Sequence, residues 1–152
     1  LGPATCSPRP APAKKKPERR THVAFRTFLG TGGRRIYVGK GAADNDTLTL
    51  TAARPHDIFL HVRGSPGAHV ILPRDKNADV PSELLVDAAH LAAHFSSARG
   101  EHLLEVSHVE RRYVRKPKGA APGSVNVDRE KVMLLRVERE RLQRLLAAEK
   151  LD

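Results

Sequence analysis

The sequence contains no tryptophan, two tyrosines and four phenylalanines among its 152 residues. Its core must therefore be mainly aliphatic, and few aromatic rings remain for stacking on nucleic-acid bases. Cysteine is equally scarce: Cys6 is the single one, which excludes an internal disulfide framework and fits a reducing compartment. We expect a globular fold with a mainly aliphatic core.

Long apolar runs are also missing. No stretch of about 18 apolar residues occurs, and the N-terminus lacks the apolar segment of a secretory signal. From these absences we expect a cytoplasmic protein without a membrane partner. A length of 152 residues suits one modest hydrophobic core better than two.

Positive charge is in excess, with a formal net charge of +10 at pH 7. Two segments hold this excess. Residues 1–20 contain six basic side chains against Glu18, and residues 111–118 contain five basic and no acidic residues. Concentrated positive charge favours a polyanion through counterion release, so nucleic acid is the expected partner. A solubilising tail and a solvated loop are the alternative interpretation.

Proline divides the chain into segments. Five of the eleven prolines fall within the first 17 residues, so residues 1–21 are predicted to be a disordered, basic, proline-rich linker. An ordered domain is predicted over residues 22–137. A C-terminal amphipathic helix is predicted over residues 138–152.

Apolar periodicity predicts mostly strands in the ordered domain. A hairpin is expected across residues 23–38, and strict alternation predicts a half-buried strand over residues 47–51. Shorter strands are expected over residues 103–109, the basic run from residue 111, 124–127 and 132–137. A helical apolar stripe between Pro81 and Arg99 predicts one central helix. The expected fold is α+β, with an antiparallel or mixed sheet, one central helix and a C-terminal helix.

Residues 57–69 carry the densest polar chemistry. Alternate side chains of a strand point to opposite faces. One face is then apolar core: Ile58, Leu60 and Val62. The other face carries Asp57, Phe59, His61 and Arg63. A five-residue connection over residues 64–68 would place His69 opposite Arg63 and keep the apolar faces inward.

Asp57, His61 and His69 resemble an acid/base or zinc cluster, because imidazole and carboxylate groups bind zinc and transfer protons near neutral pH. The set lacks a further ligand at fixed spacing. The favoured interpretation is polar pairing in which Asp57 orients His61 or Arg63, with no catalytic residue, metal or cofactor. A hydrolase that acts on RNA or nucleotides through Asp57, His61 and His69 stays open as the alternative.

Two further polar groups receive structural interpretations. Asp87, His90 and His94 share one helical face opposite much of the apolar stripe, which predicts a solvated surface rather than a metal site. Asn45 and Asp46 precede the alternating segment and are predicted to cap a turn.

The basic run is the strongest ligand-binding signal. Arginine can donate two parallel hydrogen bonds to one phosphate, and lysine supplies a point charge. Tyr113 lies within the run, where its ring can stack on a base. The residues predicted to dock on RNA through this run are Arg111, Arg112, Arg115, Lys116 and Lys118. The residues predicted to shape the adjoining RNA-binding surface are Lys40, Arg54, Asp57, His61, Arg63 and His69.

Nine short motifs then follow one family pattern in order across about residues 25–137. They are Tyr37-Val-Gly-Lys40, Asn45-Asp46, Leu48-Thr49, Arg54-Pro-His-Asp57, His61-Val-Arg-Gly64, Pro66-Gly-Ala-His69, Ala88-Ala89, Ser96 to Gly100 and Val114-Arg-Lys-Pro-Lys-Gly119. This pattern resembles the NFACT-R domain. The order and number of the matches make the resemblance specific.

The resemblance implies the RNA-binding domain of ribosome-associated quality-control factors of the RqcH and NEMF type, or a standalone NFACT-R protein. Such factors engage large ribosomal subunits obstructed by peptidyl-tRNA. The expected function is a non-catalytic module whose partners are tRNA, large-subunit rRNA and the large ribosomal subunit. A protein-interaction module that uses the final helix is a third possibility.

Overall fold

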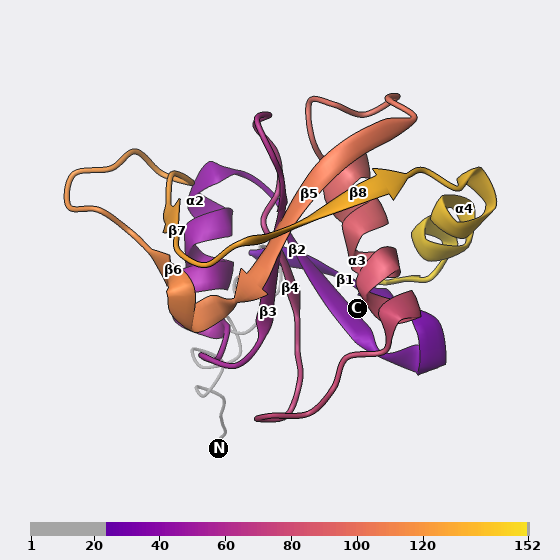
Figure 1. Ribbon diagram of the computed structural model, residues 1–152, viewed down its shortest axis with the longest axis horizontal. Coiled ribbons are helices and arrows are strands. Elements are labelled where there is room, and N and C mark those ends of the chain that lie inside the picture. Colours follow the sequence, from indigo (N-terminus) through magenta and orange to yellow (C-terminus); the bar gives the residue numbers. More distant parts are fainter. Residues whose placement is uncertain (1–23, 152) are drawn as a thin grey trace, which may run out of the picture.

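The computed structural model describes residues 24–151; the predicted linker over residues 1–21 lies outside the described residues (Figure 1). Seven strands form one sheet in the order β8-β5-β3-β4-β2-β1-β9, and each neighbouring pair is antiparallel. These strands are β1 (Phe25–Leu29), β2 (Arg35–Gly39), β3 (Ile58–Val62), β4 (Val70–Leu72), β5 (Leu103–Glu110), β8 (Lys131–Arg136) and β9 (Glu149–Lys150). The expected α+β fold with an antiparallel sheet is confirmed.

A second, two-stranded sheet and three helices complete the domain. The small sheet pairs β6 (Val114–Arg115) with β7 (Asn126–Val127). The helices are α2 (Ala42–Asp46), α3 (Ser82–His94) and α4 (Arg139–Ala147), with short helical segments η2 (Thr31–Gly33), η3 (Thr47–Ala52) and η4 (Arg111–Tyr113). Among residues 24–151, no helix has the length and apolar character needed to span a bilayer.

The main core lies between α3 and one face of the large sheet. Its fully buried members include Phe28, Ile36, Val38, Leu60, Val70, Leu72, Leu84 and Leu91. Alanines at positions 88, 89, 92 and 93 let α3 approach the strands closely. Truncating a buried leucine such as Leu91 to alanine in a core of this kind costs about 2–5 kcal/mol. The predicted central helix is confirmed.

The other face of the sheet carries a smaller apolar cluster. Its buried members are Leu48, Phe59, Ile71, Val109 and Val114. The predicted alternation along β3 is correct, since Leu60 and Phe59 belong to opposite clusters. The face that carries Phe59 is nevertheless not a purely polar surface, because η3 and β6 contribute residues that cover it.

The half-buried strand predicted over residues 47–51 is wrong. The chain there is helical: α2 continues directly into the π-helix η3. The hydroxyl of Thr47 donates to the carbonyl of Ala43, which supports a helical turn. Leu48 and Thr49 are both buried although they are neighbours, so alternation does not describe their burial. Tertiary contacts here override the β propensity of threonine.

The β3–β4 connection is longer than predicted. Leu60 pairs with Val70, which extrapolates to His69 opposite His61 rather than opposite Arg63. The predicted register is wrong by two residues, and an even shift leaves the same side chains facing the core. The extra length arises because the connection is tied to the end of α3, where the amide of Ala68 donates to the carbonyl of Phe95.

The predicted hairpin over residues 23–38 is confirmed as β1 paired with β2. The predicted C-terminal helix is confirmed as α4, but the chain leaves the helix after Ala147. It then forms β9 on the outer edge of β1, with Lys150 opposite Thr27. Because Leu145 is fully buried in the main core, the apolar side of α4 packs inside its own domain.

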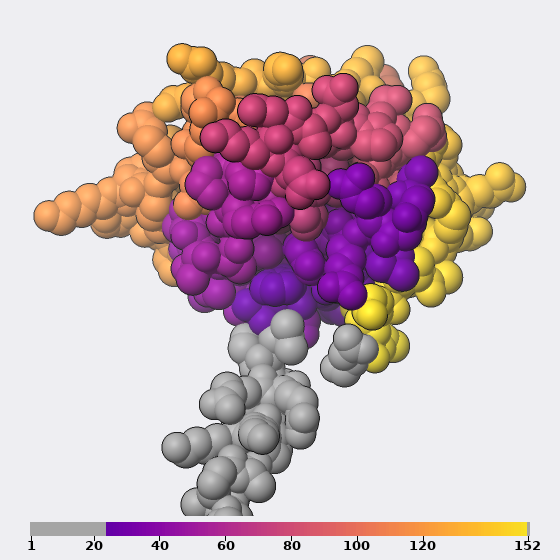
Figure 2. All heavy atoms as spheres, turned by 90° about the horizontal axis from the view of Figure 1, so that it is seen from below, coloured from indigo at the N-terminus to yellow at the C-terminus, as the bar shows by residue number. Residues whose placement is uncertain are grey.

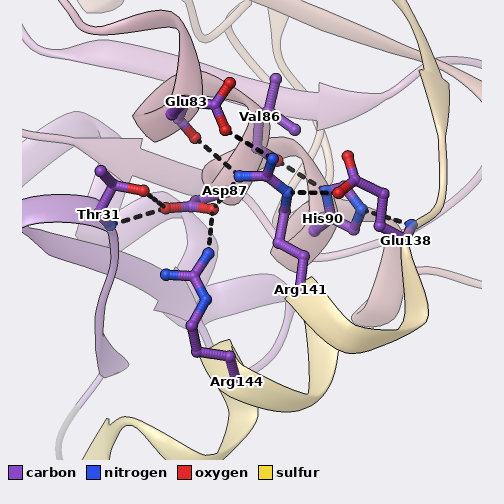
Figure 3. A network of polar contacts seen from close by, with 8 residues as sticks. All are labelled: Thr31, Glu83, Val86, Asp87, His90, Glu138, Arg141 and Arg144. Atoms are coloured by element: carbon purple, nitrogen blue, oxygen red, sulfur yellow. Dashed lines mark hydrogen bonds and ion pairs between the residues drawn. The ribbon is translucent and has the colours of Figure 1, made fainter.

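A polar network holds α4 against α3 (Figure 3). Asp87 on α3 is fully buried, and its Oδ1 accepts hydrogen bonds from Arg141 at 2.7 Å and Arg144 at 3.0 Å on α4. Its Oδ2 accepts from both the amide and the hydroxyl of Thr31, each at 2.7 Å. One carboxylate therefore joins α3, α4 and the β1–β2 turn.

The predicted solvated face of α3 is thus wrong for two of its three residues. Asp87 and His90 are fully buried, and His94 is half-buried. His90 Nε2 accepts from the amide of Glu138 at 2.8 Å, while Nδ1 lies 2.8 Å from the carbonyl of Val86. The helix that follows β8 covers this face, which the periodicity of α3 alone did not reveal.

Candidate nucleic-acid interface

The predicted site residues are split between two ends of the sheet. One end of the sheet, where β2 and β3 end and β4 begins, carries Lys40, His61 and His69. Arg54 and Asp57 lie at the opposite end of β3. Asp57 and His61 are four residue steps apart along the strand, a distance of about 13 Å. Figure 1 shows α2, β6 and β7 together at one side of the molecule, with α4 at the far side.

His61 and His69 form an edge-to-face pair with ring centroids 5.6 Å apart. His69 is almost fully buried, and both of its ring nitrogens are engaged. Nδ1 lies 2.8 Å from the hydroxyl of Thr49, and Nε2 lies 3.1 Å from the carbonyl of Gly123. Since a carbonyl only accepts, Nε2 carries the proton and Nδ1 accepts from Thr49. His69 therefore connects η3 to the loop before β7.

The environment keeps both imidazoles neutral near pH 7. Burial lowers the pKa of His69 to about 4, and the neighbouring His61 adds to that effect. Burial also lowers the pKa of His61. Neutral rings can accept or donate hydrogen bonds and stack, but they do not provide fixed positive charge for a phosphate.

Asn45 links the loops at this end of the sheet instead of capping a local turn. Its Oδ1 accepts from the amide of His69 at 3.1 Å, and its Nδ2 donates to the carbonyl of Gly67 at 3.4 Å. A Cβ at Gly39 would lie 2.0 Å from Asn45 Oδ1. Only glycine at position 39 leaves room for this amide, so the Gly39 and Asn45 motifs are structurally coupled.

Asp57 orients neither His61 nor Arg63, contrary to prediction. Its carboxylate accepts from the amides of Arg54 at 2.9 Å and Arg74 at 3.2 Å. The guanidinium of Arg54 also lies 3.5 Å from the same carboxylate. Asp57 therefore fixes the loops before β3 and after β4.

The candidate acid/base set is consequently not assembled, because Asp57 is remote from the histidine pair. Within residues 24–151, no group of three or more His, Cys, Asp or Glu side chains has the arrangement of a metal site. Arg63 is exposed and lies near two carboxylates, 3.3 Å from Glu105 and 3.7 Å from Glu130.

Arg111, the first residue of the basic run, has a structural environment. Its guanidinium donates to the carbonyl oxygens of Thr49 and Leu50, at the C-terminal part of η3, and to that of Val114. Burial lowers the pKa of Arg111. These bonds satisfy carbonyl groups at a helix end, so Arg111 has few donors left for a phosphate.

Tyr113 already contacts two cations. The guanidinium carbon of Arg112 lies 4.8 Å from its ring centroid, and that of Arg129 lies 5.0 Å away. Arg112 also forms an ion pair with Glu110 at 2.8 Å. Arg129, which sequence reasoning missed, stands 16 residues beyond Tyr113 and follows β7, so no local pattern indicated it.

The later basic residues lie on or beside a projecting loop. The segment between β6 and β7 extends away from the body, as Figure 2 shows. Arg115 pairs with Asp128 at 3.1 Å, and Lys116 pairs with Asp46 at 3.0 Å. Lys118 is exposed and makes no side-chain ion pair or hydrogen bond with the described residues. The run therefore combines paired cations with a free one.

A groove of about 620 Å³ opens beside the histidine pair. It is lined by the end of β2, the start of α2, the β3–β4 connection and the loop before β7, and its cationic side chains are Arg26 and Lys40. Sequence reasoning missed Arg26, because its β1 neighbours Phe25 and Phe28 indicate a buried strand rather than a binding site.

Comparison with known proteins gives a consistent family match. The model of the NFACT protein RNA binding domain matches residues 24–129. The protein named Rqc2 homolog RqcH from Streptococcus suis is 36% identical over 121 residues, which cover 79% of this chain and 20% of the relative. The protein of the same name from Bacillus subtilis is 34% identical over 121 residues, 79% of this chain and 21% of that relative.

A solved structure shares the fold. It is described as the C-terminal part of the fibronectin/fibrinogen-binding protein from Streptococcus suis, and it matches with a TM-score of 0.75 and 32% sequence identity. The match covers 82% of this chain and 49% of the other. The chain thus spans about half of that structure and a fifth of the curated relatives it matches.

Proposed function

Because the chain belongs to the family of NFACT protein RNA binding domains, we propose that it is a non-catalytic module that binds tRNA or large-subunit rRNA. The observation that carries this proposal is the projecting β6–β7 loop with its cations, in a domain whose family binds RNA. Phosphates would contact Arg115, Lys116 and Lys118 on or beside the loop and Lys40 next to it.

At the level of the whole factor, we place the domain in ribosome-associated quality control on obstructed large subunits. The supporting relatives carry the name Rqc2 homolog RqcH, and this chain corresponds to about a fifth of them. We therefore ascribe RNA docking to the chain, and C-terminal tailing of stalled peptides to a full factor. A cytoplasmic location follows from this role.

The alternatives receive less support. A hydrolase that uses Asp57, His61 and His69 needs them in one site, whereas Asp57 is bonded to Arg54 and Arg74 at the other end of β3. A protein-interaction module that uses the apolar side of the final helix needs that side to be free. Leu145 instead fills the main core.

Co-sedimentation with purified ribosomal subunits tests the proposal. The 152-residue chain should pellet with large subunits that carry peptidyl-tRNA and remain in the supernatant with small subunits. Replacing the four proposed phosphate contacts (Lys40, Arg115, Lys116 and Lys118) with alanine should abolish pelleting. The matched control replaces four exposed cations elsewhere (Lys131, Arg136, Arg139 and Lys150) and should pellet normally. Equal loss in both variants would contradict the proposed surface.

A further inference from the structure

We infer that the groove beside the histidine pair receives one unpaired nucleotide of the bound RNA. This inference rests on the proposed function. It adds that part of the bound RNA is single-stranded. The groove volume of about 620 Å³ lies within the range of about 300–1,000 Å³ that is typical of small-molecule sites. Among the described residues, its lining contains no aspartate or glutamate, which suits a ligand that carries a phosphate.

Two cations of different character stand at the groove. Arg26 is held in place: its guanidinium pairs with Glu149 at 3.1 Å and lies 5.6 Å from the ring centroid of Phe95. Lys40 is exposed, and its ammonium has no ion pair or hydrogen bond with the described residues. A paired guanidinium and an unpaired ammonium on one groove match the needs of a phosphodiester unit.

Glycines expose the backbone along the groove. Gly39, Gly41, Gly67 and Gly123 all line it. A Cβ at Gly67 would lie 2.7 Å from the Cβ of Ser96, so the loop is packed tightly from behind. Because glycine has no side chain, a planar ligand can approach the backbone closely along these walls.

The remaining walls suit a planar base. They include Pro66, Pro122, Phe95 and the half-buried ring of His61. The pKa of His61 is lowered by burial, so the imidazole near neutral pH is an uncharged partner for a base. A base inside a duplex is stacked and paired and cannot enter a concave site of this size, whereas an unpaired nucleotide can.

Position 41 allows the groove to be filled without a change in charge. Gly41 has an extended backbone (φ −177°), and a Cβ there would meet nothing within 4 Å. Gly41→Phe should therefore fold normally and occupy the groove. The matched control is Ala43→Phe, an exposed position of α2 outside the lining. Thermal melting and circular dichroism confirm that each variant is folded.

The binding assay compares fluorescein-labelled hexauridylate with a 12-base-pair RNA duplex. Gly41→Phe should weaken hexauridylate binding at least tenfold and change duplex binding less than twofold, while Ala43→Phe changes neither. Unchanged hexauridylate binding, or an equal loss for both RNAs, would overturn the nucleotide site and leave the proposed function standing. Failure of the wild-type chain to bind either RNA would overturn both.

An NMR titration separates a nucleotide from a bare anion. Uridine monophosphate should shift the amide signals of Gly39, Gly41, Gly67 and Gly123 in the wild-type chain, and Lys40→Ala should weaken this response at least threefold. Lys131→Ala, an exposed cation on β8, is the matched control. If inorganic phosphate produced the same shifts at the same concentration, the groove would be an anion site only and the inference would be wrong.

Discussion

The ammonium of Lys116 lies 3.0 Å from the carboxylate of Asp46, a residue seventy positions earlier in the chain. Arg112 and Arg115 are similarly paired, with Glu110 and Asp128. The basic run therefore carries less uncompensated charge than its sequence indicates. RNA binding must compete with these ion pairs, and this competition makes the effect of individual variants predictable.

Asp46→Asn should strengthen RNA binding. Loss of the carboxylate removes the ion-pair partner of Lys116, whose pair with Asp46 is half-buried, and a pair near the surface is worth about 1 kcal/mol. We expect a two- to fivefold increase in affinity at about 0.1 M salt, with a steeper salt dependence. The measurement is a filter-binding titration with labelled tRNA, and Asp79→Asn, an exposed acid elsewhere, is the control. A weaker affinity in Asp46→Asn would show that Lys116 does not contact RNA.

Arg111→Ala should act mainly on stability. The guanidinium satisfies carbonyl groups of Thr49, Leu50 and Val114, and charged hydrogen bonds of this kind contribute about 1.5–3 kcal/mol. Urea denaturation should show a loss in this range, whereas Arg115→Ala should change the free energy of unfolding by less than about 0.5 kcal/mol. The reverse order would contradict the structural role of Arg111.

Asp87→Asn should weaken the attachment of α4. Removing one partner of a buried ion-pair network costs about 3–5 kcal/mol at neutral pH. Burial alone would raise the pKa of Asp87, but hydrogen bonds from Thr31 and Arg141 outweigh it and leave the pKa below its ordinary value.

Because the pKa of Asp87 is lowered in the folded state, this group makes the free energy of unfolding depend on pH at acidic values. The depressed pKa of Asp87 stabilises the fold above the unfolded-state pKa of about 3.9, and this contribution is lost as pH falls through the lower folded-state pKa. Unfolding free energies of wild type and Asp87→Asn should therefore differ most near pH 7 and converge below about pH 4. Parallel curves down to pH 2 would be inconsistent with an ionised Asp87.

His69→Gln should remove a pH dependence at milder acidity. Because burial lowers the pKa of His69 to about 4, the neutral ring stabilises the fold above the unfolded-state pKa of about 6.5. Wild type should lose up to about 3 kcal/mol of unfolding free energy as pH falls from 6.5 to 4 through this group. The variant should show a shallower slope across that window, measured by urea denaturation at matched pH values. Identical slopes would mean that His69 titrates normally.

Much of the fold was predictable because local patterns agreed with the final structure. The β1–β2 hairpin, the central helix and the alternation along β3 all follow from apolar periodicity and turn residues. Residues 47–51 were mispredicted because Thr49 is buried by its hydrogen bond to His69, a partner twenty residues away. The β3–β4 register failed by two residues because contacts with the end of α3 set the length of that connection.

The site was less predictable, since charge runs and polar clusters do not reveal their partners. Asp57 and His61 share a strand face and yet act at opposite ends of it. Asp87 and His90 looked solvated because the helix that covers them lies about fifty residues later. Arg26 and Arg129 gave no local signal, and only the folded chain brings them to the groove and to Tyr113.

The salt dependence of tRNA binding tests the central claim most directly. Each phosphate contact contributes about 0.9 to the slope of log affinity against log salt for a duplex, and about 0.7 for a single strand. Between about 50 and 200 mM salt, replacing Lys40, Arg115, Lys116 and Lys118 with alanine should reduce the slope by about 3 and weaken binding at every salt concentration. A slope unchanged from wild type would contradict RNA binding through this surface.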